Sequence, residues 1–323
     1  MGDRARDGGW KMIDQERRKE LREKGFVVVK GLLSEEEVEH YRGMIIEMSG
    51  KDPETFKSSG RGEAGWNLTD GVSKTEAFWP LISHEGLLGH LAELLGDDVK
   101  YLQHSDLQAG FSAVSWHRDN VHRNYGVGRD WEEDDEDPYD LVRVGIYLQS
   151  HEESNFSLGF IPGSHRFTGE GSSRQRAMNE WKFKAMGGLA WIGPTFQNMT
   201  PGAEWVPTDP GDCIIFDPRI LHSGSYIEAL KLSMFVGYGV PSDHFADLQN
   251  YYRHVRPELG YEPFTDELIA YLREHDLFAE GIVDTDEIPD AYVPTAALRK
   301  VVASRRAGED KVTAGQGRTN IEL

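Results

Sequence analysis

The chain has 323 residues, one cysteine and a formal net charge of −20 at neutral pH. The length allows one large domain or two small ones with a substantial core. The negative charge argues against a nucleic-acid partner, because phosphate binding needs clustered Lys and Arg. No apolar run reaches about eighteen residues, which excludes a transmembrane helix. The single cysteine excludes an intramolecular disulfide and a Cys-rich zinc site.

The two ends of the chain are polar, and we expect residues 1–10 and 304–323 to be disordered tails. Between them we expect a single domain over residues 11–303, either as a monomer or as a homodimer. The N-terminal segment lacks the apolar stretch of a secretory signal, which predicts a cytoplasmic protein. Cys213 lies in the apolar run CIIF and is predicted to be a small buried hydrophobic residue.

Helical patterns occur near both ends of this domain. Ser34 followed by Glu37 forms a capping box that opens a helix, and Gly25 ends a charged amphipathic segment. The predicted helices cover 13–24, the segment after Ser34, 85–95, 242–256 and 264–276.

The middle of the chain consists of short strand-like runs separated by Gly, Pro, Asp and Asn. No helix of normal length alternates with these runs, so a parallel α/β sheet is not expected, and an antiparallel sandwich or barrel of the jelly-roll kind is favoured. The runs are GFVVVKGLL, VKYLQHSDLQ, LVRVGIYLQS, NFSLGFIP, EWVPTD, DCIIFD and KLSMFVGYGV.

Two segments in this region read as loops. The stretch 168–207 is rich in Trp, Met and Gly, and long loops of this kind tend to be lids or binding loops. The acidic run EEDDED at 132–137 predicts a solvated loop, or alternatively an electrostatic guide for a cationic substrate.

A His-x-Asp pair on an extended segment places both side chains on one face, as a metal site requires. The chain has two such triplets, HSD at 104–106 and HRD at 117–119, and a His-x-Glu at 151–153. Context favours 117–119, because Trp116 precedes it and a polar, loop-like segment follows it. The triplet 104–106 lies inside a strand pattern, and 151–153 lies in a charged turn.

A third ligand is expected from a distant strand. In PGDCIIFDPRILHSGS, a turn and a buried strand lead to His222, and Lys231 begins the next strand nine residues later. This spacing returns a cation to the neighbourhood of the histidine.

Together these blocks resemble the phytanoyl-CoA dioxygenase family of Fe(II)/2-oxoglutarate-dependent oxygenases over about residues 15–240. The resemblance rests on GFVVVKGLLSEEEVEHYR, SWHRD, LVRVGIYLQS…FIPGSHR and PGDCIIFDPRILHSGS…KLSMF, in that order. It implies a mainly β, double-stranded β-helix (jelly-roll or cupin-like) core with flanking helices. It also implies iron ligands at His117, Asp119 and His222.

The resemblance also indicates residues for the co-substrate. The family usually has an Arg near Lys231 to hold the far carboxylate of 2-oxoglutarate, and a Lys pairs with a carboxylate only as a point charge. Arg143 on a neighbouring strand is the alternative. Gln108 falls where relatives often carry an amide, and Ser233 lies on the strand that Lys231 begins. The run NFSL replaces a Gly-rich turn of the family.

Four further residues are expected to contact the substrate: His104 and Asp106, which share a strand face with Gln108, and Trp116 and Asn120 beside the metal pair. For His104 and Asp106, satisfaction of polar groups in the core is the competing interpretation. His165, in PGSHR, is predicted to be part of a structural turn.

The predicted activity is oxidation of a small-molecule substrate, preferably a specialised metabolite, by Fe(II), 2-oxoglutarate and O2, with release of succinate and CO2. The carboxylate at Asp119 favours hydroxylation over halogenation, which needs a small residue there. A cupin-like metal enzyme without 2-oxoglutarate and a non-catalytic binding module are alternatives. A zinc hydrolase is disfavoured by the absence of an HExxH helix.

Overall fold

The structure is a computed structural model that describes residues 15–56, 65–113, 116–121, 128–131, 136–166, 200, 202–255 and 260–282. The predicted tails, most of the predicted loop at 168–207 and residues 132–135 of the acidic run lie outside these ranges. The ends of the predicted single domain also lie outside them, so its boundaries stay a prediction.

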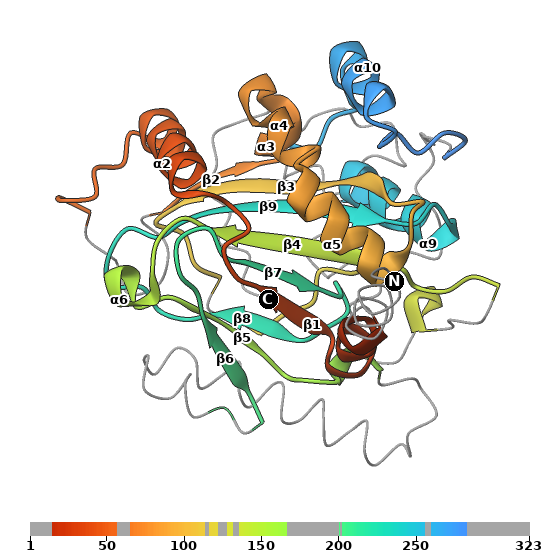
Figure 1. The fold of residues 1–323 in the computed structure, drawn as a ribbon, viewed down its shortest axis with the longest axis horizontal. Helices are drawn as coiled ribbons and strands as arrows, with labels where there is room; N and C mark the ends of the chain where they lie inside the picture. The colour runs from red at the N-terminus through yellow and green to blue at the C-terminus, as the bar shows by residue number, and fades with distance from the viewer. Residues whose placement is uncertain are drawn as a thin grey trace, which may run out of the picture.

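Two antiparallel sheets form the centre of the protein (Figure 1). The larger has the order β1-β7-β4-β9-β3-β2, and the smaller has the order β6-β5-β8. The strands of the larger sheet are β1 (Phe26–Val29), β2 (Trp66–Thr69), β3 (Lys100–Ala109), β4 (Leu141–Tyr147), β7 (Cys213–Phe216) and β9 (Leu232–Gly239). Those of the smaller are β5 (Ser157–Phe160), β6 (Glu204–Pro207) and β8 (His222–Gly224). This mainly β jelly-roll architecture confirms the predicted fold class.

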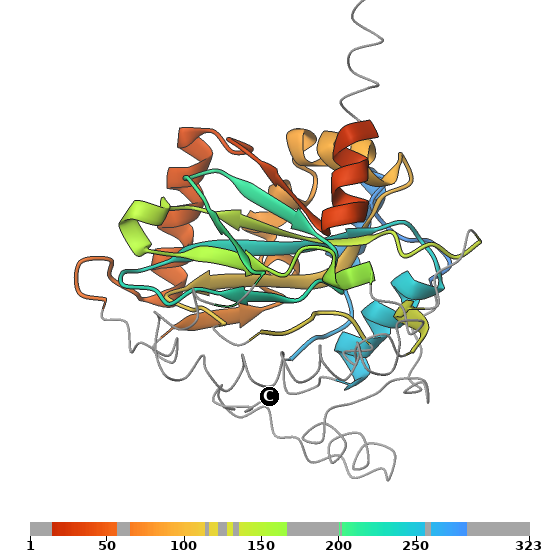
Figure 2. The same cartoon turned by 90° about the horizontal axis from the view of Figure 1, so that it is seen from below.

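Several helices cover one face of the larger sheet, and α9 (Asp243–Asn250) packs in a separate cluster with Leu102 and Leu141. A first helix occupies residues 15–24. It is followed by α2 (Glu35–Ser49), α3 (Gly71–Lys74), α4 (Trp79–Ile82) and α5 (Glu85–Leu95), and later by α6 (His151–Ser154), α9 (Asp243–Asn250) and α10 (Asp266–Glu274). Short 3-10 turns lie at Glu76–Phe78, Arg129–Trp131 and Ser164–Arg166, and a π-helical turn, η4, lies at Tyr251–Val255. Figure 2, turned by 90°, shows the strands as stacked layers with α2 along one side.

The predicted capping box is present at the start of α2. The Ser34 hydroxyl accepts from the Glu37 backbone N–H at 3.3 Å, and the Glu37 carboxylate accepts from the Ser34 N–H at 2.8 Å. The predicted helix at 85–95 has the bounds of α5. The predicted helix at 242–256 is divided into α9 and the π-helical turn, which a periodicity of 3.6 does not distinguish. In the described part of the chain, no helix combines the length and apolar character that crossing a membrane requires.

Side chains alternate across the larger sheet, and this alternation creates the site. One set packs against the helices, including Val144 of β4 and Val236 of β9. The opposite set faces the smaller sheet, where the ring centroids of Phe216 (β7) and Phe160 (β5) lie 5.6 Å apart. Cys213 is buried in the helix-facing set, as predicted. The interior between the two sheets holds the polar residues described next.

Candidate metal centre

His117 and His222 are paired through their backbones. The His117 N–H donates to the His222 carbonyl at 2.9 Å, and the His222 N–H donates to the His117 carbonyl at 3.0 Å. This isolated bridge attaches the 116–121 segment to the start of β8. The two imidazole rings consequently lie 4.3 Å apart between centroids, although 104 intervening residues separate them in the chain.

Asp119 completes a cluster with these two histidines. Its carboxylate lies 3.8 Å from His117 Nε2 and 3.4 Å from His222 Nε2, and one ligand atom from each of the three residues lies within 4.8 Å of the others. Asp119 and His222 are each 4% exposed. Two imidazole nitrogens and one carboxylate on one side form the donor set of a non-haem iron(II) site. The three predicted ligands therefore fit such an ion.

The cation that neutralises Asp119 is Arg143. Its Nη1 lies 2.5 Å from Asp119 Oδ2, and its Nη2 pairs with Asp106. Burial acts to raise the pKa of Asp119, but Arg143 and then His222 hold it well below its usual range, so the carboxylate is ionised. Burial raises the pKa of Asp106 to about 6. The Asp119 backbone carbonyl accepts from the Tyr252 hydroxyl at 2.8 Å, which ties the metal loop to η4.

A cavity of about 50 Å³ adjoins the two histidines. It reaches from the imidazoles to the buried end of β9, and both candidate cations, Arg143 and Lys231, line it. Its other lining residues are Gln108, Phe111, Ala113, His117, Phe156, Leu158, His222, Gly224 and Phe235.

Polar side chains cross the sheet in a row at the end of this cavity. Ser233 of β9 lies opposite Gln108 of β3 on one side and opposite Tyr147 of β4 on the other. Gln108 Oε1 accepts from Lys231 Nζ at 2.8 Å and from the Ser233 hydroxyl at 3.2 Å. The buried Tyr147 hydroxyl has no hydrogen-bond partner among the described residues. Gln108, Lys231, Ser233 and Tyr147 form a cluster of polar groups, which we call the polar row.

Lys231 is the dominant charge of the polar row. It is 2% exposed, and its ammonium group lies 4.5 Å from the centre of the Phe156 ring. Burial, and secondarily Arg143, lowers its pKa to about 7, while Asp106 acts in the opposite direction. Within the described ranges its hydrogen-bond acceptors are Gln108 and the Phe111 carbonyl. A carboxylate ligand would complete the environment of this amine.

The sequence did not single out Tyr147 or Tyr252. Tyr147 was detectable in principle, because Arg143 and Tyr147 lie four residues apart on one strand and therefore share a face. Tyr252 was not, since 133 residues separate it from Asp119 and only the fold brings them together.

The four predicted substrate contacts lie around the metal cluster, and none of them lines the 50 Å³ cavity. His104 stacks on Tyr252 with ring centroids 4.0 Å apart, and Asp106 pairs with Arg143. Trp116 packs against Trp205 at 5.7 Å. The Asn120 amide donates to Asp130. Their contact with a substrate stays a prediction.

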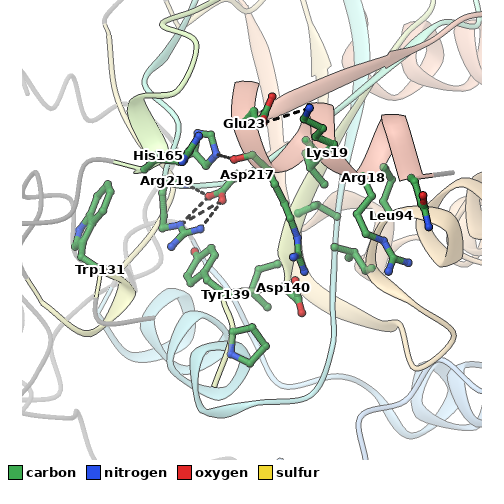
Figure 3. Close-up of a pocket in the computed structure, with 18 residues that line it drawn as sticks. Arg18, Lys19, Glu23, Leu94, Trp131, Tyr139, Asp140, His165, Asp217 and Arg219 are labelled. Atoms are coloured by element: carbon green, nitrogen blue, oxygen red, sulfur yellow. Dashed lines mark hydrogen bonds and ion pairs between the residues drawn. The ribbon is translucent and has the colours of Figure 1, made fainter. Parts of the chain in front are cut away.

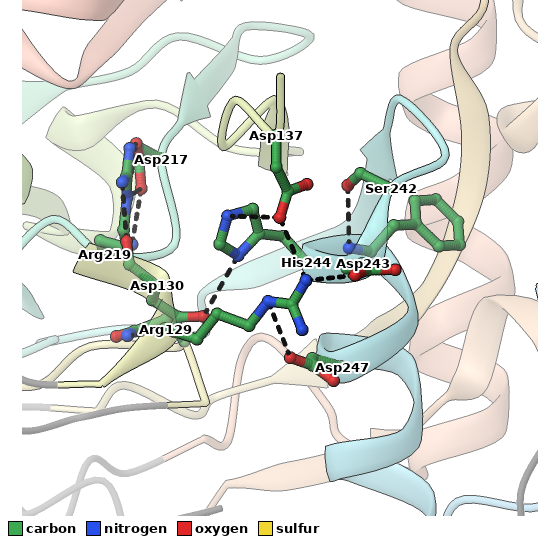
Figure 4. A network of polar contacts seen from close by, with 11 residues as sticks. Arg129, Asp130, Asp137, Asp217, Arg219, Ser242, Asp243, His244 and Asp247 are labelled. Carbon is green, nitrogen blue, oxygen red and sulfur yellow. Dashed lines mark hydrogen bonds and ion pairs between the residues drawn. The ribbon is translucent and has the colours of Figure 1, made fainter. Parts of the chain in front are cut away.

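The end of the acidic run takes part in a polar network near Asn120 (Figure 4). Asp137 accepts from Arg129 at 3.1 Å, and Arg129 also pairs with Asp243 at the start of α9. Asp130 accepts from Asn120 Nδ2 at 2.5 Å. Through Arg129, Asp137 is linked to the start of α9, so this residue of the acidic run is paired with an arginine outside the run.

A second cavity, of about 940 Å³, lies between the first helix, α5 and the start of β4 (Figure 3). It contains none of the three metal-cluster residues. Arg219 and Asp217 pair at its wall at 2.7 Å. His165 donates to the Arg22 carbonyl at 3.0 Å and packs against Gly25, where φ is +94° and an added Cβ would lie 2.5 Å from its Nδ1. His165 therefore belongs to a structural turn, as predicted.

Solved structures similar to this chain include three with low sequence identity. HygX from Streptomyces hygroscopicus, with nickel and 2-oxoglutarate bound, is 19% identical with a TM-score of 0.50, over 70% of this chain and 86% of that chain. EctD from S. alaskensis with bound Fe is 19% identical with a TM-score of 0.48, over 70% and 76%. The non-heme alpha ketoglutarate dependent epimerase SnoN from nogalamycin biosynthesis is 17% identical with a TM-score of 0.47, over 70% and 82%. The likeness to HygX is one of fold.

No curated protein matches the sequence. A family profile does: that of "Phytanoyl-CoA dioxygenase (PhyH)" matches residues 21–227. The match covers more than half of the chain and includes all three residues of the metal cluster. The chain therefore belongs to the phytanoyl-CoA dioxygenase family of Fe(II)/2-oxoglutarate-dependent enzymes.

Proposed function

We propose that this protein is an oxygenase that oxidises a small-molecule substrate and releases succinate and CO2 from 2-oxoglutarate. His117, Asp119 and His222 would hold the ferrous ion, which leaves part of its coordination sphere for other ligands. When bound, iron and 2-oxoglutarate supply the activation of oxygen, and the protein supplies position and exclusion of water.

The observation that carries the proposal is the buried ammonium group of Lys231 in the same cavity as the two imidazoles. A buried charge is costly unless it is paired. A dicarboxylate with one end at the metal cluster and the other at Lys231 would supply that pairing. Ser233 and Tyr147, the hydroxyl groups of the polar row, would donate to the same carboxylate.

Lys231 suits this role better than Arg143, the alternative cation. Both terminal nitrogens of Arg143 already contact carboxylates, one of Asp119 and one of Asp106. Lysine lacks the bidentate fork of arginine. The Tyr147 hydroxyl, which has no partner among the described residues, would offset part of that loss by offering a further donor.

Aromatic side chains give the cavity its low polarity. The Phe156 ring lies against the ammonium group of Lys231. The centre of the Phe235 ring lies 5.5 Å from Lys231 Nζ and 4.8 Å from the guanidinium carbon of Arg143. Such walls keep bulk water from the charges and strengthen electrostatic interactions between a ligand and Lys231. The site would therefore discriminate strongly between a dicarboxylate and a neutral keto compound.

For the substrate that is oxidised, the sequence supports only a general chemical class. The net charge of −20 disfavours polyanions such as coenzyme A thioesters, because a negatively charged surface repels them. We propose a specialised metabolite, with hydroxylation as the preferred outcome because Asp119 supplies a carboxylate ligand.

The test is succinate formation by the full-length protein supplied with Fe(II), 2-oxoglutarate and O2, screened against a panel of small metabolites. We expect slow succinate formation without substrate and stimulation by the correct one. His222→Ala should remove both. Metal binding with no dependence on 2-oxoglutarate would instead favour a cupin-like enzyme, and absence of both would favour a binding module.

A further inference from the structure

The buried ion-pair cluster beside the metal residues has an unusual charge composition. Arg143 contacts Asp119 with one terminal nitrogen and Asp106 with the other, and Asp106, Asp119 and Arg143 are 8%, 4% and 8% exposed. With both carboxylates ionised, one positive and two negative charges leave a net charge of −1. One carboxylate would suffice to neutralise Arg143, so Asp106 is surplus to a simple ion pair.

Packing fixes Arg143 in place before any ligand binds. Its guanidinium lies 4.8 Å from the centre of the Phe235 ring. That ring occupies the space above Gly145, where an added Cβ would lie 2.8 Å from Phe235 Cε1. Asp106 holds one terminal nitrogen of the guanidinium, Nη2, and Asp119 contacts the other, Nη1. Arg143 is thereby oriented toward one oxygen of Asp119, Oδ2.

We propose that Arg143, anchored by Asp106, is a positioning residue that restricts Asp119 to binding the metal through one oxygen and so keeps space for the keto acid. The inference rests on the proposed function. A carboxylate with both oxygens free can bind a metal through both, which would occupy a position that a chelating keto acid needs. Arg143 engages one oxygen and prevents this.

Substitution of Arg143 should change the affinity for the metal and the affinity for the keto acid in opposite directions. Arg143→Gln changes the net charge of the cluster from −1 to −2, so Co(II) or Fe(II) should bind about tenfold more tightly by Coulomb attraction at the effective dielectric of a buried site. The same change releases Asp119 Oδ2, so 2-oxoglutarate should bind about tenfold more weakly. Asp106→Asn changes the net charge to 0, so the metal should bind about tenfold more weakly.

A structural role for this cluster predicts a different pattern, because loss of packing would weaken metal and keto-acid binding together. The double variant Asp106→Asn/Arg143→Gln restores the net charge of −1. We expect its metal affinity to return to near that of the wild type, while 2-oxoglutarate affinity stays low. This double-mutant cycle isolates the coupling between the two side chains.

Arg143→Lys is a second variant, to be measured if Arg143→Gln does not fold. It keeps the charge but has no fork to span two carboxylates, so metal affinity should remain within about twofold and keto-acid affinity should fall. Arg253→Gln is a matched control, because Arg253 is 5% exposed and contacts Gln103 at 2.5 Å rather than Asp119. It should leave both affinities unchanged even if it lowers stability.

The experiment is anaerobic titration of the full-length protein at one pH, first with Co(II) or Fe(II) and then with 2-oxoglutarate, followed by visible absorption. Opposite shifts in metal affinity for Arg143→Gln and Asp106→Asn are the expected result. Parallel losses of metal and keto-acid affinity in all Arg143 variants would overturn the inference. If the wild type itself binds neither metal nor 2-oxoglutarate, the proposed function fails and not this inference alone.

Discussion

Among individual residues, Lys231 carries the most specific prediction about ligand binding. Lys231→Met removes the only cation of the polar row and is nearly isosteric, so we expect 2-oxoglutarate affinity to fall about 100-fold, which corresponds to about 2.7 kcal/mol. Metal affinity should be retained, because Lys231 does not contact the metal cluster. Anaerobic titrations of metal and of 2-oxoglutarate check the two parts separately. A Lys231→Met variant with wild-type 2-oxoglutarate affinity would move the role to Arg143.

The pKa of Lys231 also sets a pH dependence. Because that pKa is about 7 in the ligand-free protein, the amine is charged below pH 7 and becomes neutral above it. A carboxylate ligand favours the charged form, so binding above pH 7 must take up a proton. We expect 2-oxoglutarate affinity to be level below pH 7 and to fall about tenfold per pH unit above it. An affinity that is constant from pH 6 to pH 9, measured by calorimetry, would contradict this.

The ligand assignment predicts the effect of removing single donors. Asp119→Ala and His222→Ala should each abolish stoichiometric Fe(II) binding and turnover, since two remaining donors do not make the three-ligand site. His151→Ala is the matched control, because His151 belongs to the rejected His-x-Glu triplet and bonds the Phe156 carbonyl at 2.8 Å. Normal turnover in Asp119→Ala or His222→Ala would end the assignment.

At the scale of elements, the alternation on β4 and β9 decides which side chains reach the cavity. Gly145→Ala would place a methyl group 2.8 Å from the Phe235 ring and 2.9 Å from the Tyr147 hydroxyl. We expect a loss of about 1–3 kcal/mol in the free energy of unfolding through overpacking, with weaker 2-oxoglutarate binding. Chemical denaturation and ligand titration check this.

Gly43→Ala provides the comparison for Gly145→Ala. Gly43 lies within α2, and an added Cβ would meet nothing within 4 Å. The substitution should stabilise the protein by about 1 kcal/mol, because alanine is a better helix former. Equal effects of the two substitutions would argue against a packing role for Gly145.

Some of these elements could be predicted from the sequence and others could not. The strands other than β2 and β8 and the capping box at Ser34 were predictable, because period-two alternation and cap chemistry are local, and local loop signals favoured 117–119 over 104–106. The two ion pairs of Arg143 were not predictable, since Asp106 approaches it only when β3 and β4 are both paired with β9, and Asp119 belongs to the segment that the His117–His222 bridge holds in place. The short helices α3 and α4 have too few residues to show a period.

At the scale of the whole molecule, the two sheets and the metal cluster should be energetically linked. The bridge between His117 and His222 joins the 116–121 segment to the smaller sheet, and Tyr252 ties the same segment to the region after α9. A metal that binds the folded protein alone adds about 2.7 kcal/mol to the free energy of unfolding at 100 times its Kd. Thermal unfolding with and without Co(II) should show this gain in the wild type and not in His222→Ala. A gain that persists in His222→Ala would place the metal elsewhere.

The most direct test of the central claim is an anaerobic crystal structure with Fe(II) and 2-oxoglutarate. We predict one ion bound by His117, Asp119 and His222, with the keto acid beside it and its far carboxylate against Lys231 and the hydroxyl groups of the polar row. An ion bound by other residues, or a far carboxylate that displaces Asp106 or Asp119 from Arg143, would contradict the account.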